Sequence, residues 1–261
     1  MGVVVTERKA APASRLRAAQ AAAAVGWQQV ARQKESLSQL RQKYGVDEIL
    51  ICKQDHSVLS TSSGELFFHL NMAQLRTKNI RLGKGDRLGE VMGLRGGETV
   101  LDCTLGLGAD AIVCSYLVGE SGRVVAVEKS PVIAYIVQEG LSEYKAGSER
   151  LTAALRQIEV LNADYKDYLK RQPANSFDIV YFDPMFTKPI MESQALMGLR
   201  AVADNSVLDR DSVAEALRVC KKMVVLKNNA ASPLFQELGF TMATSGKYSK
   251  VKYGYILKGS S

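Results

Sequence analysis

Alternating apolar and amphipathic blocks divide the second half of the chain into strands and helices. Short, nearly continuous apolar runs, as expected for strands covered on both faces, occur at residues 99–102, 123–127, 158–161, 178–182 and 223–226. Patterns of helical period lie between them, at about residues 109–118, 131–144, 165–171 and 211–220. This alternation predicts an α/β fold with a doubly wound, Rossmann-like parallel sheet that carries helices on both faces.

The end of the chain follows a different pattern. Two short apolar segments, residues 239–242 and 252–257, flank a polar turn around Ser245 and Gly246. Two strands joined by such a turn predict a C-terminal antiparallel hairpin that closes the sheet.

The first 70 residues predict a separate, small α/β domain. Strand patterns occur at residues 3–5, 27–30, 49–52, 57–59 and 65–70, and helical patterns at residues 12–25 and about 36–44. Gly26 and Gly45 are placed to end the two helices. The sequence thus predicts an N-terminal domain over residues 1–70, a basic helical connector over 71–97, and a large domain over 98–261.

Composition indicates a globular protein that favours an anionic partner. Hydrophobic residues make up 46% and charged residues 23% of the 261, and no apolar run is long enough to span a bilayer. The 34 basic residues outnumber the 27 acidic ones, which favours a partner such as nucleic acid. Four cysteines without a C-x-x-C pair, and only two histidines, argue against a zinc or other metal site and for the reduced thiols of the cytoplasm.

The first strand of the large domain ends in a glycine-rich turn preceded by an acid. Asp102 is followed by Gly106 and Gly108, which allow a tight turn and close approach of a ligand to the backbone. The dinucleotide fingerprint is incomplete, because Ala111 stands where its third glycine belongs, and Asp102 would repel a pyrophosphate. An acid beside G-x-G suits a ligand that carries an ammonium group, such as S-adenosylmethionine.

Two more acids stand at the ends of the next two strands. Glu128 lies 22 positions after Gly106 and is placed to accept hydrogen bonds from a ribose diol. Asp164 follows the third strand and can accept from an adenine amino group. Three acids at successive strand ends predict a class I methyltransferase, with a dehydrogenase as the competing interpretation.

The fourth strand ends in Asp183-Pro184-Met185-Phe186. An exocyclic amine on a base is a poor nucleophile because its lone pair is delocalised into the ring. The Asp183 carboxylate and the Pro184 carbonyl can accept the two amine protons, while Phe186 can stack on an unstacked base. This motif predicts catalysis by positioning the amine, without a strong general base.

Basic residues suggest where a nucleic acid binds. The candidates are Arg76, Lys78, Arg81, Lys84 and Arg87 in the connector, Lys227 at the end of the fifth strand, and Lys247 in the hairpin. A solvated linker and a strand-end lysine that reaches solvent are the alternative interpretations.

Taken together, these motifs resemble the ribosomal RNA small-subunit methyltransferase J family, which methylates guanine N2. The resemblance runs from about Gly83 to the end and rests on Gly83-Lys84-Gly85-Asp86, Asp102-x-Thr104-x-Gly106-x-Gly108-x-Asp110, Glu128, Asp183-Pro184-Met185-Phe186 and the strand that contains Lys227. It implies cofactor contacts from Asp102, Thr104, Gly106, Gly108, Ala109, Asp110, Glu128, Lys129, Asp164, Tyr165 and Asp183. The chain departs from the family pattern at Ala109, Lys129 and Asp164-Tyr165, and at Thr187, where a proline is usual.

The sequence therefore predicts a cytoplasmic S-adenosylmethionine-dependent RNA methyltransferase that acts on guanine N2 of small-subunit ribosomal RNA. Its expected partner is that RNA or the small ribosomal subunit, and no oligomeric state follows from the motifs. A DNA or small-molecule amino-methyltransferase, and a non-catalytic RNA-binding protein with the same fold, are the alternatives.

Overall fold

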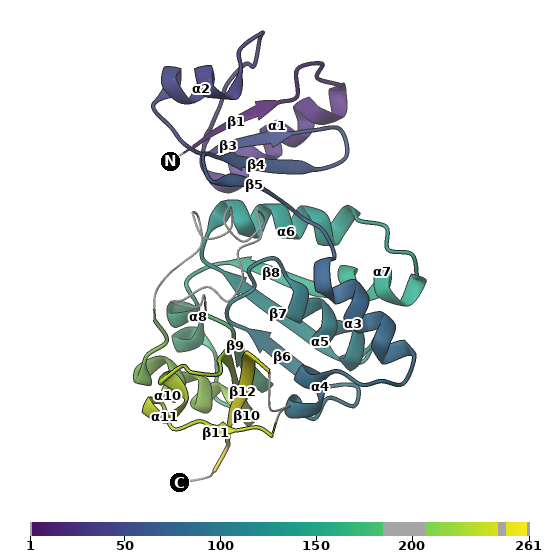
Figure 1. Ribbon diagram of the computed structural model, residues 1–261, viewed down its shortest axis with the longest axis vertical. Helices are drawn as coiled ribbons and strands as arrows, with labels where there is room; N and C mark the ends of the chain where they lie inside the picture. The colour runs from purple at the N-terminus through teal and green to yellow at the C-terminus, as the bar shows by residue number, and fades with distance from the viewer. Residues whose placement is uncertain (1, 185–206, 245–248, 260–261) are drawn as a thin grey trace.

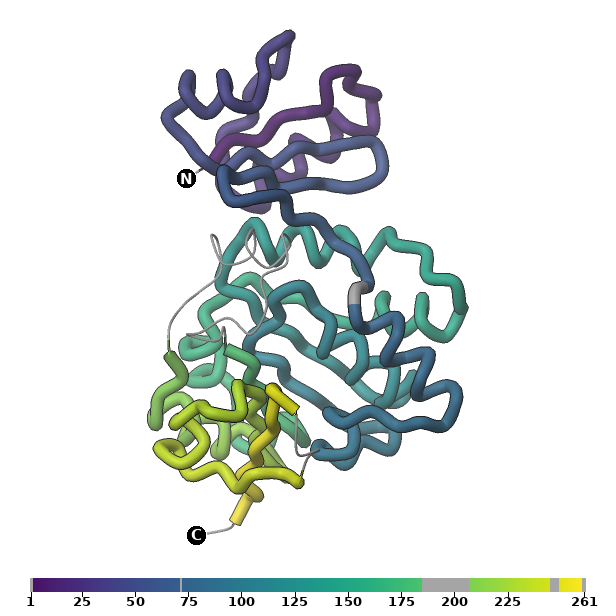
Figure 2. Tube along the Cα trace, viewed as in Figure 1, coloured from purple at the N-terminus to yellow at the C-terminus, as the bar shows by residue number. Residues whose placement is uncertain are grey.

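The computed structural model describes residues 2–184, 207–244 and 249–259, and places a small N-terminal sheet above a larger α/β unit (Figures 1 and 2). Met185, Phe186 and Lys247 of the predicted site lie outside the described residues. No helix in the described part of the chain is both long and apolar enough to cross a bilayer.

The large unit is built on a seven-stranded sheet in the order β11-β12-β10-β9-β6-β7-β8. Its strands are β6 (Thr99–Asp102), β7 (Arg123–Glu128), β8 (Ile158–Asn162), β9 (Phe177–Phe182), β10 (Cys220–Asn229), β11 (Thr241–Met242) and β12 (Val251–Leu257). Strands β6 to β10 are parallel, whereas β12 runs antiparallel to both β10 and β11. The predicted doubly wound sheet and closing hairpin are confirmed, and β10 is longer than the pattern at residues 223–226 indicated.

Helices cover both faces of this sheet, as Figure 1 shows. They are α3 (Asn71–Arg81), α4 (Arg87–Met92), α5 (Ala109–Val118), α6 (Pro131–Glu143), α7 (Glu149–Arg156), α8 (Tyr165–Arg171), α10 (Arg210–Val219) and α11 (Leu234–Glu237). Successive strand residues alternate between two apolar clusters, because strand side chains alternate in direction: Val124 packs with α5 and α7, and Val125 with α8 and α10. Helix α7 was not among the predicted helices.

The N-terminal sheet has five strands in the order β2-β1-β3-β4-β5. They are β1 (Val3–Thr6), β2 (Gln28–Gln29), β3 (Ile49–Cys52), β4 (Ser57–Thr61) and β5 (Gly64–Phe67), accompanied by α1 (Pro12–Val25) and α2 (Leu37–Tyr44). Both helices end at a glycine with positive φ, 70° at Gly26 and 64° at Gly45, as the sequence predicted. Val4 packs toward α1, whereas Val3 and Val5 pack toward α2.

The N-terminal sheet sits on α6 through both polar and apolar contacts. Arg17 of α1 pairs with Glu139 at 2.7 Å and with Glu143 at 2.8 Å. At the end of β5, the Phe68 ring fills the space above Gly140, where a Cβ atom would lie only 2.0 Å from Phe68 Cγ. The apolar cluster under α1 continues into α6, so the two sheets share one core.

Candidate active site

The glycine-rich turn lies between β6 and α5, at the switch point where the chain order of the sheet reverses. Gly106 and Gly108 both have positive φ, 51° and 80°. A Cβ atom on Gly108 would also lie 3.3 Å from Val137 Cγ1 of α6. Glycine is therefore required here for backbone geometry, and the open ends of β6 and β9 form the edge where doubly wound sheets bind ligands.

Thr104 joins the ends of the two central strands. Its backbone N–H donates to Asp102 Oδ1 at 2.9 Å, and its Oγ1 accepts from the Asp183 N–H at 2.6 Å. The cofactor turn after β6 and the D-P motif after β9 are thus held in direct contact. The resemblance placed Thr104 among the cofactor contacts, and the structure shows it as a link between both motifs.

Asp102 and Glu128 are buried carboxylates that face this edge. Burial, with the nearby Asp110 and Asp183 carboxylates, raises the pKa of Asp102 to about 8, although the Thr104 amide opposes the shift. Glu128 accepts from the Gly106 N–H at 3.1 Å and from the Ser130 N–H at 2.8 Å, one on each oxygen. Both carboxylate oxygens of Glu128 are thus held at the end of β7, where a carboxylate is the type of group that accepts from ribose hydroxyls.

Asp164 caps helix α8 and lies beside Lys129. Its side chain accepts from the Lys166 N–H at 2.9 Å, and the Lys129 Nζ lies 3.0 Å from its other oxygen. Tyr165 points away into the core, edge-on to Phe182 with ring centroids 5.5 Å apart. Asp164 and Lys129 are therefore brought to the ligand edge, whereas the Tyr165 ring is not.

These groups fit S-adenosylmethionine. The ends of β6, β7 and β8 carry acceptors for an ammonium, a ribose diol and an adenine amine, in that order. Gly106 and Gly108 have no side chain that would keep the ligand away from the backbone of the turn. Ala109 begins α5 directly after the turn, so its backbone borders the same edge.

Asp183 lies at one end of a buried set of charges. Lys227 of β10 donates to Asp183 Oδ2 and to Asp110 Oδ2, both at 2.7 Å. Asp110 also accepts from the Tyr181 hydroxyl at 2.9 Å and pairs with Arg76, which in turn binds Asp86 at 2.8 Å. The predicted RNA-binding residues Arg76 and Lys227 are thus paired inside the protein.

The charges in this set determine the protonation of the carboxylates. Burial raises the pKa of Asp183 to about 6 and Asp110 adds to the rise, while Lys227 opposes it. For Asp110, burial is outweighed by Lys227 and Arg76, which together hold its pKa below the ordinary value. Asp183 is consequently the carboxylate of the pair that gains a proton first as the pH falls.

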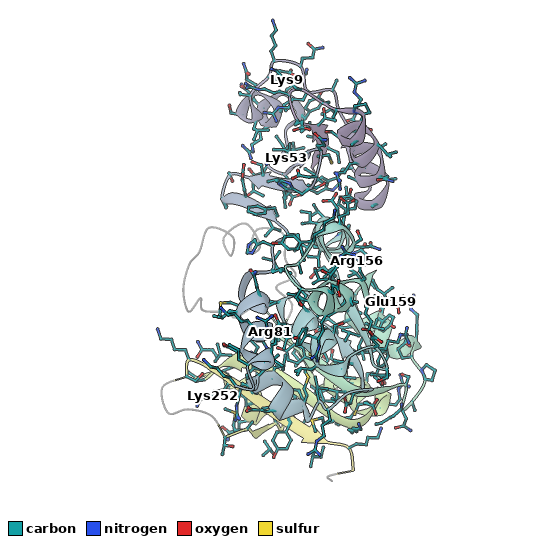
Figure 3. All side chains as sticks on the ribbon, turned by 90° about the vertical axis from the view of Figure 1, so that its right-hand side faces the viewer. Lys9, Lys53, Arg81, Arg156, Glu159 and Lys252 are labelled. Atoms are coloured by element: carbon teal, nitrogen blue, oxygen red, sulfur yellow. The ribbon has the colours of Figure 1, made fainter. Side chains whose placement is uncertain are left out.

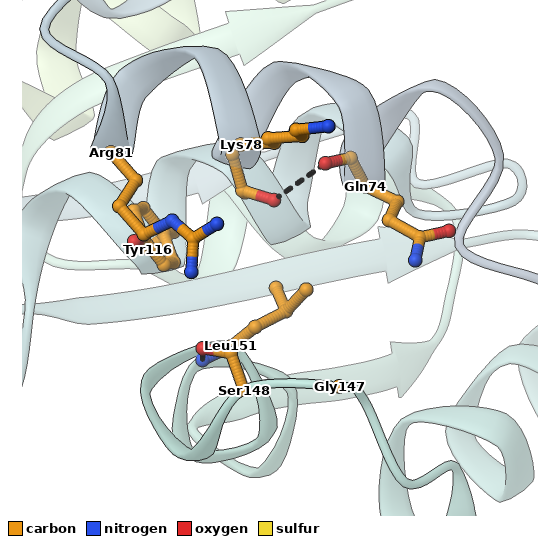
Figure 4. Close-up of a pocket in the computed structure, with 8 residues that line it drawn as sticks. Gln74, Lys78, Arg81, Tyr116, Gly147, Ser148 and Leu151 are labelled. Atoms are coloured by element: carbon orange, nitrogen blue, oxygen red, sulfur yellow. Dashed lines mark hydrogen bonds between the residues drawn. The ribbon is translucent and has the colours of Figure 1, made fainter.

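The remaining basic candidates lie on and after α3. Figure 3 shows Arg81 on α3 in the larger unit, away from Lys9 and Lys53 in the N-terminal unit. Lys78 and Arg81 line a pocket that faces Ser148 at the start of α7 (Figure 4). Lys84 is exposed, and Arg87 pairs with Glu90 at 3.2 Å.

Sequence reasoning missed three residues of this region. Tyr181 was interpreted only as an apolar strand residue, although a buried tyrosine hydroxyl needs a partner and therefore signalled a polar neighbour. Asp86 caps α4, and no sequence pattern indicated that its side chain also pairs with Arg76 of α3. Asn162 ties β8 to β7 by donating to the Glu128 carbonyl at 2.9 Å, and nothing in the sequence signalled it.

The large unit has a doubly wound sheet whose strand β12 runs antiparallel to its neighbours, and acids lie at the ends of β6, β7 and β9. These features define a class I methyltransferase fold and site. Residues 29–252 match the family described as "Putative SAM-dependent methyltransferase". The chain belongs to this family, and the predictions of S-adenosylmethionine as cofactor and of methyltransferase activity are confirmed.

Similar proteins extend over most of the chain. The uncharacterised protein YpiP of Bacillus subtilis is 39% identical over 225 residues, covering 86% of this chain and 87% of that protein. The ribosomal RNA small subunit methyltransferase J of Saccharophagus degradans is 31% identical over 184 residues, covering 64% and 66%. The match thus spans slightly less than two thirds of that relative's length.

The fold agrees with a solved structure. A SAM-dependent methyltransferase from Neisseria gonorrhoeae superposes with a TM-score of 0.66, at 17% identity, and the match covers 99% of this chain and 97% of that one. The match includes the N-terminal sheet, so the predicted α/β fold is confirmed over both units.

Proposed function

We propose that this protein transfers a methyl group to guanine N2 of small-subunit ribosomal RNA in the cytoplasm. The observation that carries the proposal is Asp183 at the end of β9: its side chain is 24% exposed, its carboxylate accepts from Lys227, and its backbone N–H donates to Thr104. The similarity to ribosomal RNA small subunit methyltransferases J supports RNA as the substrate.

The residues of this edge suit an exocyclic amine. Asp183 accepts one amine proton and the Pro184 carbonyl the other, which turns the nitrogen lone pair out of the ring plane. Bound S-adenosylmethionine supplies a methyl group on a sulfonium that needs no further activation. Asp183 and Pro184 contribute mainly by orientation, and the proton released from nitrogen passes to the Asp183 carboxylate and then to solvent. Phe186, two residues beyond Pro184, is proposed to stack on the base.

RNA binding is proposed for the exposed cations of α3 and the following loop. Lys78, Arg81 and Lys84 make no ion pair with any residue in the described ranges. Because a phosphate does not have to displace a carboxylate from them, these three side chains are better placed for RNA than Arg76, Arg87 or Lys227.

The test is methyl transfer to defined RNA. Small-subunit ribosomal RNA and intact small subunits, both from cells that lack the gene, are incubated with the protein and radiolabelled S-adenosylmethionine, and the nucleosides are identified by mass spectrometry. We expect N2-methylguanosine in at least one of the two substrates. Methylation of DNA or a small molecule alone would contradict the proposal, and RNA binding without any transfer would leave a non-catalytic RNA-binding protein.

The role of α3 is tested by the double variant Lys78→Gln/Arg81→Gln. We expect weaker RNA binding and a salt dependence of log Kd that is shallower by about 1.4 to 2, because each phosphate contact releases about one counterion. The matched control is Lys9→Gln/Lys34→Gln, which removes two exposed cations from the N-terminal unit. Equal losses in both double variants would show that α3 has no special role.

A further inference from the structure

We propose that Lys227 and Asp110, backed by Arg76 and Asp86, form a buried ion chain that positions Asp183 for methyl transfer. The inference rests on the proposed function, and it assigns to Lys227 a positioning role in place of contact with RNA. Hereafter "ion chain" means these five residues, Asp86, Arg76, Asp110, Lys227 and Asp183.

The ion chain joins five separate elements of the fold by charges of alternating sign. Asp86, the cap of α4, binds both Nε and Nη2 of Arg76 on α3, at 2.8 and 2.9 Å. Arg76 reaches Asp110 on α5, and Lys227 on β10 connects Asp110 to Asp183 after β9 with two contacts of 2.7 Å. A shift of any one element is therefore transmitted to the carboxylate at the substrate edge.

Burial argues that the ion chain is kept for more than stability. The side chains of Asp86, Asp110, Arg76 and Lys227 are 7%, 9%, 18% and 20% exposed. Desolvating such charges costs free energy that their attraction often only offsets, and packed apolar residues frequently serve stability equally well. Asp183, with 24% exposure, is the last member of the chain, so the chain ends at the carboxylate proposed to contact the substrate.

Lys227 has two effects on Asp183. By binding Oδ2 it fixes the plane of the carboxylate, and this leaves Oδ1 as the oxygen assigned to the amine proton. By its charge it also favours the ionised, accepting form against burial and against Asp110, which competes for the same ammonium group. Asp110 thus holds Lys227 in place. Its own negative charge also raises the pKa of Asp183, which is opposite to the effect of Lys227.

Other titratable groups are packed around Asp183 and Lys227. Asp102 at the end of β6 is a further buried carboxyl group near Asp183, and its pKa of about 8 leaves it neutral in the range where Asp183, with a pKa of about 6, takes up its proton. The Tyr181 hydroxyl donates to Asp110, and Tyr253 on β12 lies opposite Lys227 in the β10–β12 ladder. Burial raises the pKa of both phenols, so both tyrosines stay neutral at ordinary pH. Among the described residues, Lys227 is accordingly the cation in direct contact with Asp183.

Lys227→Met and Asp110→Asn are expected to move the pH profile of kcat in opposite directions. Activity needs ionised Asp183, so it falls as the pH drops through the pKa of this group. Lys227→Met removes the attracting charge, and we expect its acid limb about one pH unit or more higher; from a pKa of about 6, a rise of one unit alone lowers kcat at pH 7 by about twofold. Asp110→Asn removes the repelling carboxylate, and the acid limb of this variant moves to lower pH.

Affinity for S-adenosylmethionine should change less than about threefold in Lys227→Met. Lys227→Arg should restore the wild-type acid limb.

The matched control is Lys222→Met on the same strand. Lys222 pairs with Asp178 at 3.5 Å at the opposite end of β9 and β10 and is 52% exposed, so its removal should leave the acid limb unchanged. Circular dichroism and melting curves establish that each variant folds. If Lys227→Met does not fold, Asp110→Asn still decides the direction of the shift, and Lys227→Arg tests whether a cation at this position is enough for the wild-type limb.

A second readout separates this inference from the proposed function. The carboxyl carbon of Asp183, labelled with ¹³C and assigned with Asp183→Asn, reports its protonation without any RNA. Absence of methyl transfer to ribosomal RNA by the wild type would overturn the proposed function alone. An Asp183 titration that Lys227→Met leaves in place, or that both variants move in the same direction, would overturn the ion chain.

Discussion

Replacement of Asp183 by alanine should abolish methyl transfer while leaving binding of S-adenosylmethionine nearly intact. The variant removes the acceptor that orients the amine, and a lost positioning or proton-accepting group costs about 10²- to 10⁴-fold in rate. Lys227 keeps Asp110 as a partner at 2.7 Å, so no buried cation is stranded and the fold should persist. Single-turnover transfer to ribosomal RNA gives the rate, and calorimetry gives the cofactor affinity.

The matched control for this variant lies on the same strand. Asp178→Ala removes a carboxylate from the start of β9, where it accepts from the Thr99 N–H at 2.9 Å and from the Thr99 hydroxyl at 2.8 Å. We expect this control to lower the melting temperature but to retain most of the rate. Asp183→Ala with wild-type turnover would remove Asp183 from the reaction.

Glu128→Ala should instead act on the cofactor. Loss of two hydrogen bonds from hydroxyls to a charged acceptor, at about 1.5 kcal/mol or more each, lowers affinity for S-adenosylmethionine by about 100-fold or more. The truncation also releases the Gly106 and Ser130 amides that Glu128 holds at 3.1 and 2.8 Å, so the glycine turn loosens as well. Isothermal calorimetry measures the affinity, and kcat at saturating cofactor should fall much less.

Glu159→Ala provides the comparison for Glu128→Ala. Glu159 lies on the adjacent strand β8, is 47% exposed and pairs with Arg123 at 2.7 Å, away from the acids at the strand ends. Its removal should leave the affinity unchanged. An unchanged affinity in Glu128→Ala would show that the ribose is held elsewhere, and Glu128→Gln, which keeps one acceptor oxygen, should lie between wild type and alanine.

Most of the fold could be predicted because each strand of the large sheet carries its own apolar signature. The segment Ile179 to Phe182 is covered on both faces, so its continuous apolar run predicts a strand even when the neighbouring strands are not known. Helix α7 was missed because it follows α6 after a short loop, so its pattern was not separated from that of the preceding helix. Long-range pairing likewise decides the true length of β10, where Asn229 still pairs with Val251.

The site was predictable at the strand ends and not beyond them. Asp102 and Glu128 follow from position alone, because the ends of parallel strands meet at one edge. The partners of a charged side chain depend on elements far apart in the chain, so local sequence could not show that Lys227 binds Asp110. Arg76 illustrates the same point, since a basic helix looks identical whether its arginine faces RNA or a buried aspartate.

The shared core between the N-terminal sheet and α6 has a consequence for the order in which the chain folds during synthesis. The ribosome releases α1 long before α6, so the α1 face that finally contacts α6, with Ala18 and Ala21 in the shared cluster, has no partner while β6 and β7 are still being made. The N-terminal unit therefore completes its folding only when a later segment arrives.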